Sequence, residues 1–495
     1  MIADLSQRDA VRNINCAGKI LAPGFIDVHS HSDELWLALP RCDGKIAQGV
    51  TTEIGGNCGM SVAPLAGPGL ERVRRSAKHL KVDVQWRNLD EFFSLIEESG
   101  TALNVATLVG LGTTRQTVSG DSERRLNADE LRAQADAVRT ACEHGAVGVS
   151  SGLIYPPSMY AHRDELVAMA QAAREAGSAL YASHVRDEAD RVVEAIAECL
   201  DIGERAGVTV QCSHHKASGK KNWGKVHQTL ELIDDARGRG VDAFCDVYPY
   251  TASWTDLSTI LPDSAHYGGT ADTIARLSDP EQRAAIALYL QLHQAENWHD
   301  IMITEVGSEK NRELAGMRMD EIARMWFLPP AHAAIRLLVE ERLEVGAIFF
   351  KMNEDDVATV LSAGFCCVGS DASSRALSGV TARGVPHPRT YGTFPRVFGR
   401  FVRQRKTLDL VEAVRRMTSL PADIFNLRDR GRIEVGRYAD LVLFDQDTIV
   451  DKATYEDPFH FPAGISHVFV NGRPVIADGE FTRELPGRVL RNGGR

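Results

Sequence analysis

This 495-residue chain lacks several features that mark other protein classes. No apolar run approaches the roughly 20 residues that a membrane-spanning helix needs. The start, residues 1–12, is polar and mixed in charge, unlike the apolar core of a signal peptide. The net charge of −11 comes without the basic stripe that nucleic-acid binding requires. We therefore expect a cytoplasmic protein that binds neither membranes nor nucleic acids.

The chain also lacks a disulfide pattern. Its nine cysteines are an odd number, scattered between positions 16 and 367 without a Cys-x-x-Cys pair. Such a distribution is typical of reduced thiols. With 44% hydrophobic and 25% charged residues, the composition is that of a soluble protein long enough for one large domain and a smaller one.

Short apolar runs rich in β-branched residues alternate with longer, charged segments of helical pattern, which is typical of βαβ units. The runs are 20–31, 50–58, 104–110, 146–152, 178–186, 208–216, 242–250 and 365–371. Several helix candidates between them end at a glycine suited to a helix C-cap. Eight strands alternating with helices predict an α/β fold of the (β/α)8 TIM-barrel type, with its chemistry at the carboxyl ends of the strands.

Two regions exceed a minimal barrel. The connection between the seventh and eighth strands, residues 251–364, is far longer than a crossover helix requires, which predicts a lid or insert at about 256–345. After the last barrel helix, which should include 408–426, short strands are expected at 438–444, 467–470 and 473–476. Asn471-Gly472 predicts a hairpin between the last two. We expect a barrel over 23–427 and a small β domain built from 1–22 and 428–495.

Residues able to bind a metal stand where the predicted strands end. His29 and His31 close the first strand, and alternate residues of a strand face the same side. A lone His-x-His is more often a structural accident, so the prediction depends on further ligands. The second, fifth, sixth and eighth strands end at Cys58, His184, His214 and Asp371. These are zinc-ligand types, and one barrel face would gather them for metal-assisted hydrolysis.

A set of motifs narrows the function. They are GFIDVHSH at 24–31, QGVTT at 48–52, GNCG at 56–59, GLIYPP at 152–157, SHVRDE at 183–188, SHHK at 213–216, YPY at 248–250, GSD at 369–371 and HPR at 387–389. Together they resemble the N-acyl-D-amino-acid deacylases, or D-aminoacylases, of the amidohydrolase superfamily, from about residue 18 onward. The resemblance implies zinc-dependent hydrolysis of linear N-acyl-D-amino acids to a carboxylate and a free D-amino acid, on a barrel carrying a small β-sandwich.

The resemblance also implies a division of the metal ligands. One zinc is held tightly by Cys58, His184 and His214, and a second, weaker metal position lies among His29, His31 and Asp371. Many relatives bridge two metals with a lysine from the fourth strand. Residues 146–152 contain no lysine, so Cys58 is the expected anionic ligand.

Roles in the reaction follow for four residues. Asp371 is our choice for general base, because a carboxylate beside zinc can take a proton and later pass it to the departing amine. The alternative for Asp371 is a helix N-cap. The residues that the resemblance implies for binding the substrate's carboxylate are Lys216, Tyr248 and Arg389. His215 is expected to pack on the opposite face of its strand, and Trp254 and the insert are candidates for the side-chain pocket.

Some positions depart from the family's pattern. Leu111 stands where the family commonly has a histidine, Ala372 replaces a glycine, and segment 373–386 is longer than in many relatives. Only a remnant at 10–17 represents the first strands of the small domain, which predicts an incomplete sandwich with exposed edges near 430–480. A cyclic-amide hydrolase of the dihydroorotase or hydantoinase kind, or an inactive binding or assembly protein, remains an alternative. The oligomeric state, the number of metals and the preferred amino acid stay open.

Overall fold

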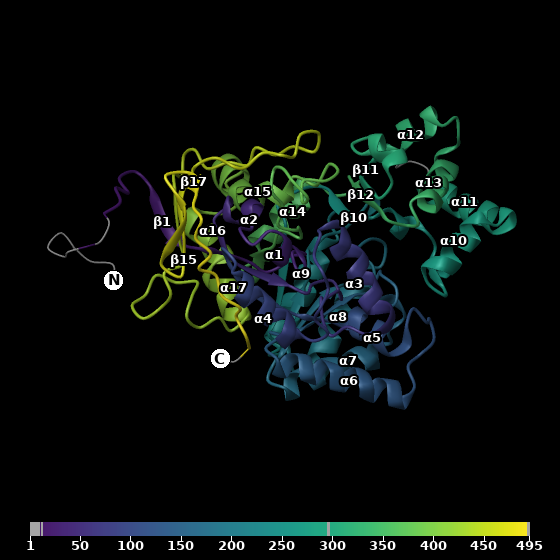
Figure 1. Cartoon of the computed structure of the whole chain (residues 1–495), viewed down its shortest axis with the longest axis horizontal. Coiled ribbons are helices and arrows are strands. Elements are labelled where there is room, and N and C mark those ends of the chain that lie inside the picture. The colour runs from purple at the N-terminus through teal and green to yellow at the C-terminus, as the bar shows by residue number, and fades with distance from the viewer. Residues whose placement is uncertain (1–9, 11–12, 295–297, 493–495) are drawn as a thin grey trace.

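The computed structural model describes residue 10 and residues 13–294 and 298–492. Four sheets occur in this part of the chain, two of them parallel and two antiparallel. Most helices accompany the parallel strands, and the two antiparallel sheets lie toward opposite ends of the molecule in Figure 1.

The parallel strands form two sheets. The three-stranded sheet has the order β2 (Phe25–Asp27), β3 (Val50–Gly55), β4 (Asn104–Thr107). The six-stranded sheet has the order β13 (Cys366–Val368), β9 (Ala243–Val247), β8 (Thr209–Cys212), β7 (Leu180–His184), β6 (Val149–Gly152), β5 (Val109–Gly110). Each of the eight segments predicted as parallel strands therefore contains at least one of these strands.

The two parallel sheets meet at both ends. Leu108 alone separates β4 from β5; its N–H donates to the carbonyl of Gly55 (3.0 Å), and the next N–H donates to the carbonyl of Gly148 (2.9 Å). At the other ends, Ser30 and Ala372 form a parallel bridge just beyond β2 and β13. The two parallel sheets are thus linked at both pairs of edges, by Leu108 between β4 and β5 and by the Ser30–Ala372 bridge between β2 and β13.

Alternate residues of these strands enter two different cores. Tyr181 of β7 and Cys245 of β9 pack in the large core shared with the helices. Their neighbours Ala182 and Phe244 join a second core with Ile54 of β3. This alternation is what the two-residue side-chain period of a strand buried on both faces produces.

Helices separate the successive parallel strands. They are α1 (Leu35–Ala38), α2 (Asp43–Ile46), α3 (Gly67–His79), α4 (Leu89–Ser99), α5 (Leu111–Ser119), α6 (Ala128–Glu143), α7 (Arg163–Glu175), α8 (Val192–Ala206), α9 (Val226–Gly238) and α14 (Glu354–Ser362). After β13, the last parallel strand, come α15 (Arg389–Arg396), the π-helical η6 (Val397–Gln404), α16 (Leu410–Met417) and α17 (Ser419–Ile424). Helix α6 begins with a capping box between Asn127 and Glu130, and α8 ends at Gly207 with φ +67°.

The first predicted strand, 20–31, is wrong as a single strand. Its beginning is a separate strand, β1 (Ile20–Pro23), which leaves the parallel array and pairs antiparallel with β14 (Leu441–Phe444). Gly24 makes the crossing possible, because a Cβ at this position would lie 2.2 Å from Thr51 Oγ1. Only β2, which follows, belongs to the parallel strands.

The C-terminal strands form one five-stranded antiparallel sheet in the order β1, β14, β15 (Ile465–Val470), β16 (Arg473–Ala477) and β17 (Glu480–Phe481). Asn471 and Gly472 join β15 to β16 with φ of +49° and +80°, so the predicted hairpin is present. Where a sandwich was expected, the described residues contain this one sheet, with β1 and β17 at its edges. Residues 10 and 13–17 contain no strand; residues 1–9, 11, 12 and 493–495 lie outside the described residues.

The segment between β9 and β13 has its own sheet and core. Strands β10 (Ser253–Asp256), β12 (Val345–Phe349) and β11 (Ile301–Val306) form an antiparallel sheet in that order. Helices α10 (Thr270–Ser278), α11 (Pro280–Gln294), α12 (Met319–Met325) and α13 (Pro330–Glu340) accompany it. Leu277, Ile303 and Leu337 are among the residues of its separate core. Short 3-10 turns complete the chain: η1 (Ser158–Tyr160), η2 (Lys220–Asn222), η3 (Leu257–Ile260), η4 (Asp263–His266) and η5 (Glu309–Leu314).

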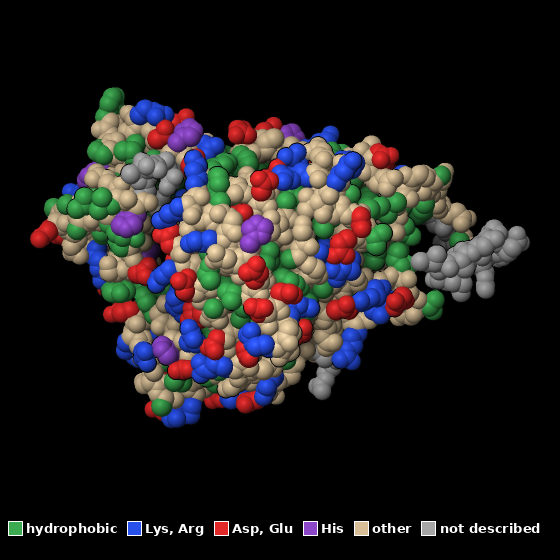
Figure 2. Space-filling view, turned by 180° about the vertical axis from the view of Figure 1, so that it is seen from behind, with side chains coloured by type: hydrophobic (Ala, Val, Ile, Leu, Met, Phe, Trp, Pro, Cys, Tyr) green, Lys and Arg blue, Asp and Glu red, His purple; other side chains and the backbone are tan. Residues whose placement is uncertain are grey.

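The surface carries both kinds of charge. On the face drawn in Figure 2, acidic and basic side chains are interspersed with apolar and neutral ones. Among the helices of the described residues, none combines the length and the apolar character needed to cross a bilayer.

Candidate metal centre

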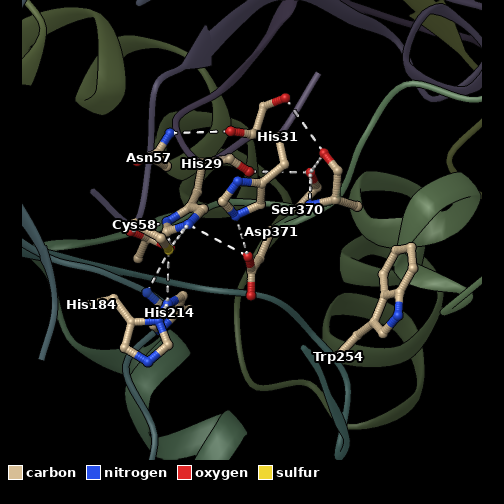
Figure 3. Close-up of polar contacts among 12 residues, drawn as sticks. His29, His31, Asn57, Cys58, His184, His214, Trp254, Ser370 and Asp371 are labelled. Carbon is tan, nitrogen blue, oxygen red and sulfur yellow. Dashed lines mark hydrogen bonds and ion pairs between the residues drawn. The ribbon is translucent and has the colours of Figure 1, made fainter. Parts of the chain in front are cut away.

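Five strand ends deliver the residues of the site. His184 is the last residue of β7, and His214 follows β8 by two positions. His29, Cys58 and Asp371 come two or three positions after β2, β3 and β13. Figure 3 shows their side chains converging on one place. All six residues predicted as metal ligands, with His31 the sixth, are brought together.

Cys58 lies at the centre of the buried part of the site. Its Sγ is 3.3 Å from His29 Nε2 and 3.5 Å from His214 Nε2. His214 Nε2 in turn lies 2.9 Å from His184 Nδ1. Cys58, His184 and His214 are exposed by only 4%, 5% and 1%. A thiolate and two imidazoles at these distances form a compact set of soft and borderline ligands.

Asp371 borders the more open part. Its Oδ1 lies 3.0 Å from His31 Nε2 and 3.5 Å from His29 Nε2. The His31 side chain is 28% exposed and that of Asp371 10%. No helix begins directly after Asp371, so the helix-cap alternative does not hold.

The donor set fits a metal ion. One ligand atom each from His29, Cys58, His214 and Asp371 lies within 4.8 Å of the other three, and His184, Glu188 and His214 form a second such group. Buried Nε2 of His184 has no hydrogen-bond partner, although a Glu188 carboxylate oxygen lies 3.9 Å away. Nitrogen, sulfur and carboxylate ligands of this kind suit zinc.

Three of these residues adopt left-handed backbone conformations. The φ angles are +52° for Cys58, +36° for His214 and +50° for Asp371. Side chains with a Cβ occupy this region at a cost, and such residues cluster at functional sites. The surrounding contacts therefore hold the backbone where these three side chains can meet.

The site keeps its acidic groups ionised. Burial by itself would raise the pKa of the Cys58 thiol, but His29, His184 and His214 outweigh burial and bring that pKa well below its ordinary value. Burial also opposes ionisation of Asp371, yet Arg389 and two histidines hold its pKa well below the ordinary value. Both groups can serve as anionic ligands.

Two carboxylates behind the histidines were missed by the sequence reasoning. Glu188 Oε1 lies 2.9 Å from His214 Nδ1, and Asp246 Oδ1 lies 3.4 Å from His29 Nδ1. Each leaves Nε2 of its histidine facing Cys58, as carboxylates behind metal-ligating histidines do. Glu188 stands four positions after His184 in the SHVRDE motif, and this spacing could have indicated that the two side chains lie near the same metal. Asp246, inside a buried strand, is distinguished only by its charge.

The predicted carboxylate-binding residues also reach the site, and all three are buried. Arg389 Nη1 lies 2.9 Å from Asp371 Oδ2, and its guanidinium stacks 4.4 Å from the ring centre of Tyr248. Lys216 Nζ is 5.6 Å from the same ring, donates to Glu188, and lies 2.8 Å from His214 Nδ1. A carboxylate of the protein thus already accompanies this ammonium.

The remaining expected residues separate in role. His215 turns away from the site, and its Nε2 lies 2.7 Å from Thr229 Oγ1 of α9. Trp254 of β10 offers its backbone carbonyl to Arg389 Nη2 (3.3 Å), while its indole N–H donates to Thr304. Leu111, where a histidine was expected, is a buried residue at the start of α5.

Cysteine, histidine and aspartate side chains that meet at the carboxyl ends of parallel strands are the arrangement of a metal-dependent hydrolase. Residues 12–476 match the amidohydrolase family, and the chain belongs to that family. An N-acyl-D-glutamate deacylase of Alcaligenes xylosoxydans xylosoxydans is 38% identical over 490 residues, which cover 99% of this chain and 90% of the relative. A D-aminoacylase from the same organism is 34% identical, covering 99% and 91% of the two chains.

Solved structures agree in fold. The N-acyl-D-glutamate deacylase of Bordetella bronchiseptica, complexed with zinc and a phosphonate mimic of the tetrahedral intermediate, matches with a TM-score of 0.81 and 36% identity over 96% of this chain and 90% of that one. A D-aminoacylase described as having a binuclear metal centre matches with a TM-score of 0.83 and 35% identity, covering 99% and 92%. A D-hydantoinase, at 16% identity and a TM-score of 0.52, shares the fold alone.

Proposed function

We propose that this amidohydrolase hydrolyses N-acyl-D-amino acids to a carboxylate and a free D-amino acid, and that the reaction depends on zinc. One observation carries the proposal: the ligand types expected for this reaction converge at the strand ends of a chain that matches deacylases over nearly its whole length. The zinc complex of the Bordetella enzyme supports the choice of metal.

In this proposal the ligands divide into a tight and a weaker position. Cys58, His184 and His214 hold one zinc, while the second position lies among His29, His31 and Asp371. Bound zinc supplies a Lewis acid that polarises the amide carbonyl and lowers the pKa of water. The ionised Cys58 gives the tight position its anionic ligand, in place of the bridging lysine that residues 146–152 do not contain.

Asp371 acts as the general base and then as the general acid. Its carboxylate is kept ionised by Arg389 and by the histidines, and it stands on the open side of the centre next to His31. A general base must lie within hydrogen-bond reach of the group whose proton it takes, and a carboxylate on the open side of the centre can meet that condition. We propose that Asp371 takes a proton from the attacking water and returns it to the leaving amine.

Arg389, Tyr248 and Lys216 bind the carboxylate of the substrate. The guanidinium can hold it through two parallel hydrogen bonds, and both cations lie near the buried Tyr248 ring, 4.4 Å (Arg389) and 5.6 Å (Lys216) from its centre. If Arg389 fixes the carboxylate and the acyl carbonyl is held at the metal ligands, the two enantiomers would place their side chains in different directions, and we propose that the site leaves room only for that of the D configuration. Selection for the D configuration follows from this three-point geometry.

We also propose the architecture that positions the site. The two parallel sheets act as one closed (β/α)8 barrel over 23–427, a reading supported by the Ser30–Ala372 bridge and by the two cores that alternate residues enter. Residues 1–22 and 428–495 then belong to a small β domain. The insert at about 256–345 is proposed as a lid, since β10, the strand that leads into it, brings Thr255 Oγ1 within 2.7 Å of Tyr155 Oη, beside His184.

One experiment tests the function. Zinc content is measured on the purified protein, and N-acetyl-D- and N-acetyl-L-amino acids are assayed side by side with a cyclic amide such as dihydrouracil. We expect bound zinc and hydrolysis of the D series alone. Zinc-free protein or equal rates on both enantiomers would reject the proposal. Preference for the cyclic amide would favour the hydantoinase alternative, and zinc-bound protein without any activity the binding-protein alternative.

A further inference from the structure

A fully buried ammonium lies beneath the open half of the metal centre. Lys45, on the short helix α2, is 0% exposed. Its Nζ donates to Asp27 Oδ2 (2.6 Å) and to Ser370 Oγ (2.7 Å), and lies 2.9 Å from Glu53 Oε1 and from the carbonyl of Ala372. Burial alone would lower the pKa of Lys45, but Asp27 and Glu53 outweigh it and raise that pKa, so the group is charged.

Lys45 contacts the residues on both sides of Asp371 in the sequence. Ser370 and Ala372 stand immediately before and after it, and both accept hydrogen bonds from the ammonium. The other oxygen of Asp27 accepts from the Ser370 N–H (2.8 Å). Asp371 between them has φ +50°, a conformation that persists only where neighbouring contacts fix it.

The Lys45 ammonium is also linked, through Glu53, to Ser30 and Ser32, the two neighbours of His31. Glu53, paired with Lys45, accepts hydrogen bonds from the hydroxyls of Ser30 and Ser32. The Ser32 Oγ also accepts from the N–H of Ser374 (2.6 Å), beyond Asp371. The segments that carry His31 and Asp371 are therefore tied to one another through the Lys45 cluster, which we define as Lys45, Asp27, Glu53, Ser30, Ser32 and Ser370.

The buried half of the centre is held in a different way. His214 is oriented from behind by Glu188 and Lys216, whose side chains both contact its Nδ1. The Cys58 backbone leads from β3 into a turn whose Gly59 N–H donates to Ser150 Oγ (3.0 Å). The two halves of the site thus depend mainly on different polar contacts, which meet at Asp246: its carboxylate accepts from the His214 N–H (2.9 Å) and lies 3.4 Å from His29 Nδ1.

We propose that Lys45 is a positioning residue that sets the contact between His31 and Asp371. This inference rests on the proposed function of Asp371 and adds a residue that touches neither substrate nor metal. The ammonium fixes where the Asp371 carboxylate stands, and its loss moves the carboxylate away from His31 without opening the Cys58 half. Displacements of about 1 Å at a reacting group cost about 100-fold in rate.

The test compares three variants by crystallography, zinc content and kinetics on an N-acetyl-D-amino acid. Lys45→Met removes the charge, and Ser370→Ala removes one acceptor beside Asp371 without leaving a charge unpaired. Arg430→Met is the matched control, because Arg430 is also a buried cation paired with a carboxylate, Asp440, but lies next to the small sheet. All three are measured against the wild type.

We expect Lys45→Met to keep its tightly bound zinc, to lose about 100-fold in kcat with KM changed less than about threefold, and to show Asp371 displaced from His31 by about 1 Å or more. Ser370→Ala should show the same pattern with about a tenfold loss. Arg430→Met should lower the thermal midpoint and leave kcat unchanged.

Two results would overturn the inference: a His31–Asp371 distance that stays at 3.0 Å in Lys45→Met, or loss of all zinc from that variant. If Lys45→Met does not fold, the distance and kcat of Ser370→Ala decide the question, and wild-type values overturn it. The crystallographic distance is independent of turnover. A wild type without deacylase activity would therefore reject the proposed function and leave this measurement valid.

Discussion

The two halves of the metal centre differ in exposure and in what supports them. Cys58, His184 and His214 are almost sealed from solvent, and Glu188 and Lys216 stand behind His214. In the other half, the His31 side chain is 28% exposed, the Asp371 side chain beside it is 10% exposed, and Arg389 faces Asp371 across 2.9 Å. A sealed, thiolate-containing set is suited to retaining a metal, while a carboxylate that lies next to a guanidinium and beside the exposed His31 is suited to meeting a substrate. We therefore propose that retention of the metal and reaction with the substrate are assigned to different strand ends.

The strongest test of this division is Cys58→Ala. Loss of the thiolate should empty the tight position and remove several kcal/mol of transition-state stabilisation, about 10⁴-fold in kcat/KM. Metal analysis after dialysis and steady-state kinetics measure the two effects. A variant that retains its full zinc would reverse our assignment of the two halves.

Asp371→Asn should separate reaction from retention. We expect the zinc to stay bound and kcat to fall about 10³-fold, because the amide cannot accept the proton. Arg389, buried beside it, loses its charged partner, so the thermal midpoint should also fall. Undiminished turnover in this variant would exclude Asp371 as the base.

His29→Ala probes the residue that touches both halves. We expect one zinc to remain and kcat to fall about 100-fold, since the ring that lies between Cys58 and Asp371 is gone. His215→Ala is its control, because His215 is equally buried but faces α9. If His29→Ala loses all zinc while His215→Ala keeps it, His29 belongs to the tight position.

Arg389→Lys tests substrate binding on the open side. Lysine keeps the charge but not the two parallel hydrogen bonds. We expect KM for N-acetyl-D-amino acids to rise about 30-fold, the value of one charged hydrogen bond, with a smaller change in kcat. The ratio of the two effects is read from initial rates. A change confined to kcat would place Arg389 with the base instead.

Glu188→Gln should have the smallest effect. Removing the carboxylate behind His214 weakens zinc affinity about tenfold, measured by competition with a chelator, and leaves the D preference intact. Asp246→Asn, which alters the carboxylate behind His29, is the matched comparison. A larger loss of tight zinc in Asp246→Asn would contradict the proposed division.

Local patterns were enough to predict much of the fold and of the site. The strand segments, the Asn471-Gly472 hairpin and the position of each ligand at a strand end follow from periodicity and from short motifs. Long-range pairing was not accessible in this way. The break at Gly24 depends on β14, more than 400 positions later, and the single C-terminal sheet depends on which strands meet.

The supporting charges were hidden for the same reason. Lys45 lies on a four-residue helix of sequence DGKI, and only the folded chain brings Asp27, Glu53 and Ser370 to it. In the sequence, Asp246 is a single charged residue in an apolar strand, and its contact with His29 is visible only in the folded chain. Candidate ligands can be found in the sequence by residue type and spacing. The residues that orient these ligands can be identified only from contacts between positions distant in the sequence.

The left-handed backbones of Cys58, His214 and Asp371 carry a consequence for the protein's evolution and engineering. Each costs roughly 1–3 kcal/mol that glycine would not incur. Replacement by glycine would relax the main chain at the very positions that supply ligands. At Asp371 that gain is opposed, because glycine would leave the buried Arg389 without its charged partner. A library that is meant to keep the centre therefore has to be screened for turnover as well as for heat resistance.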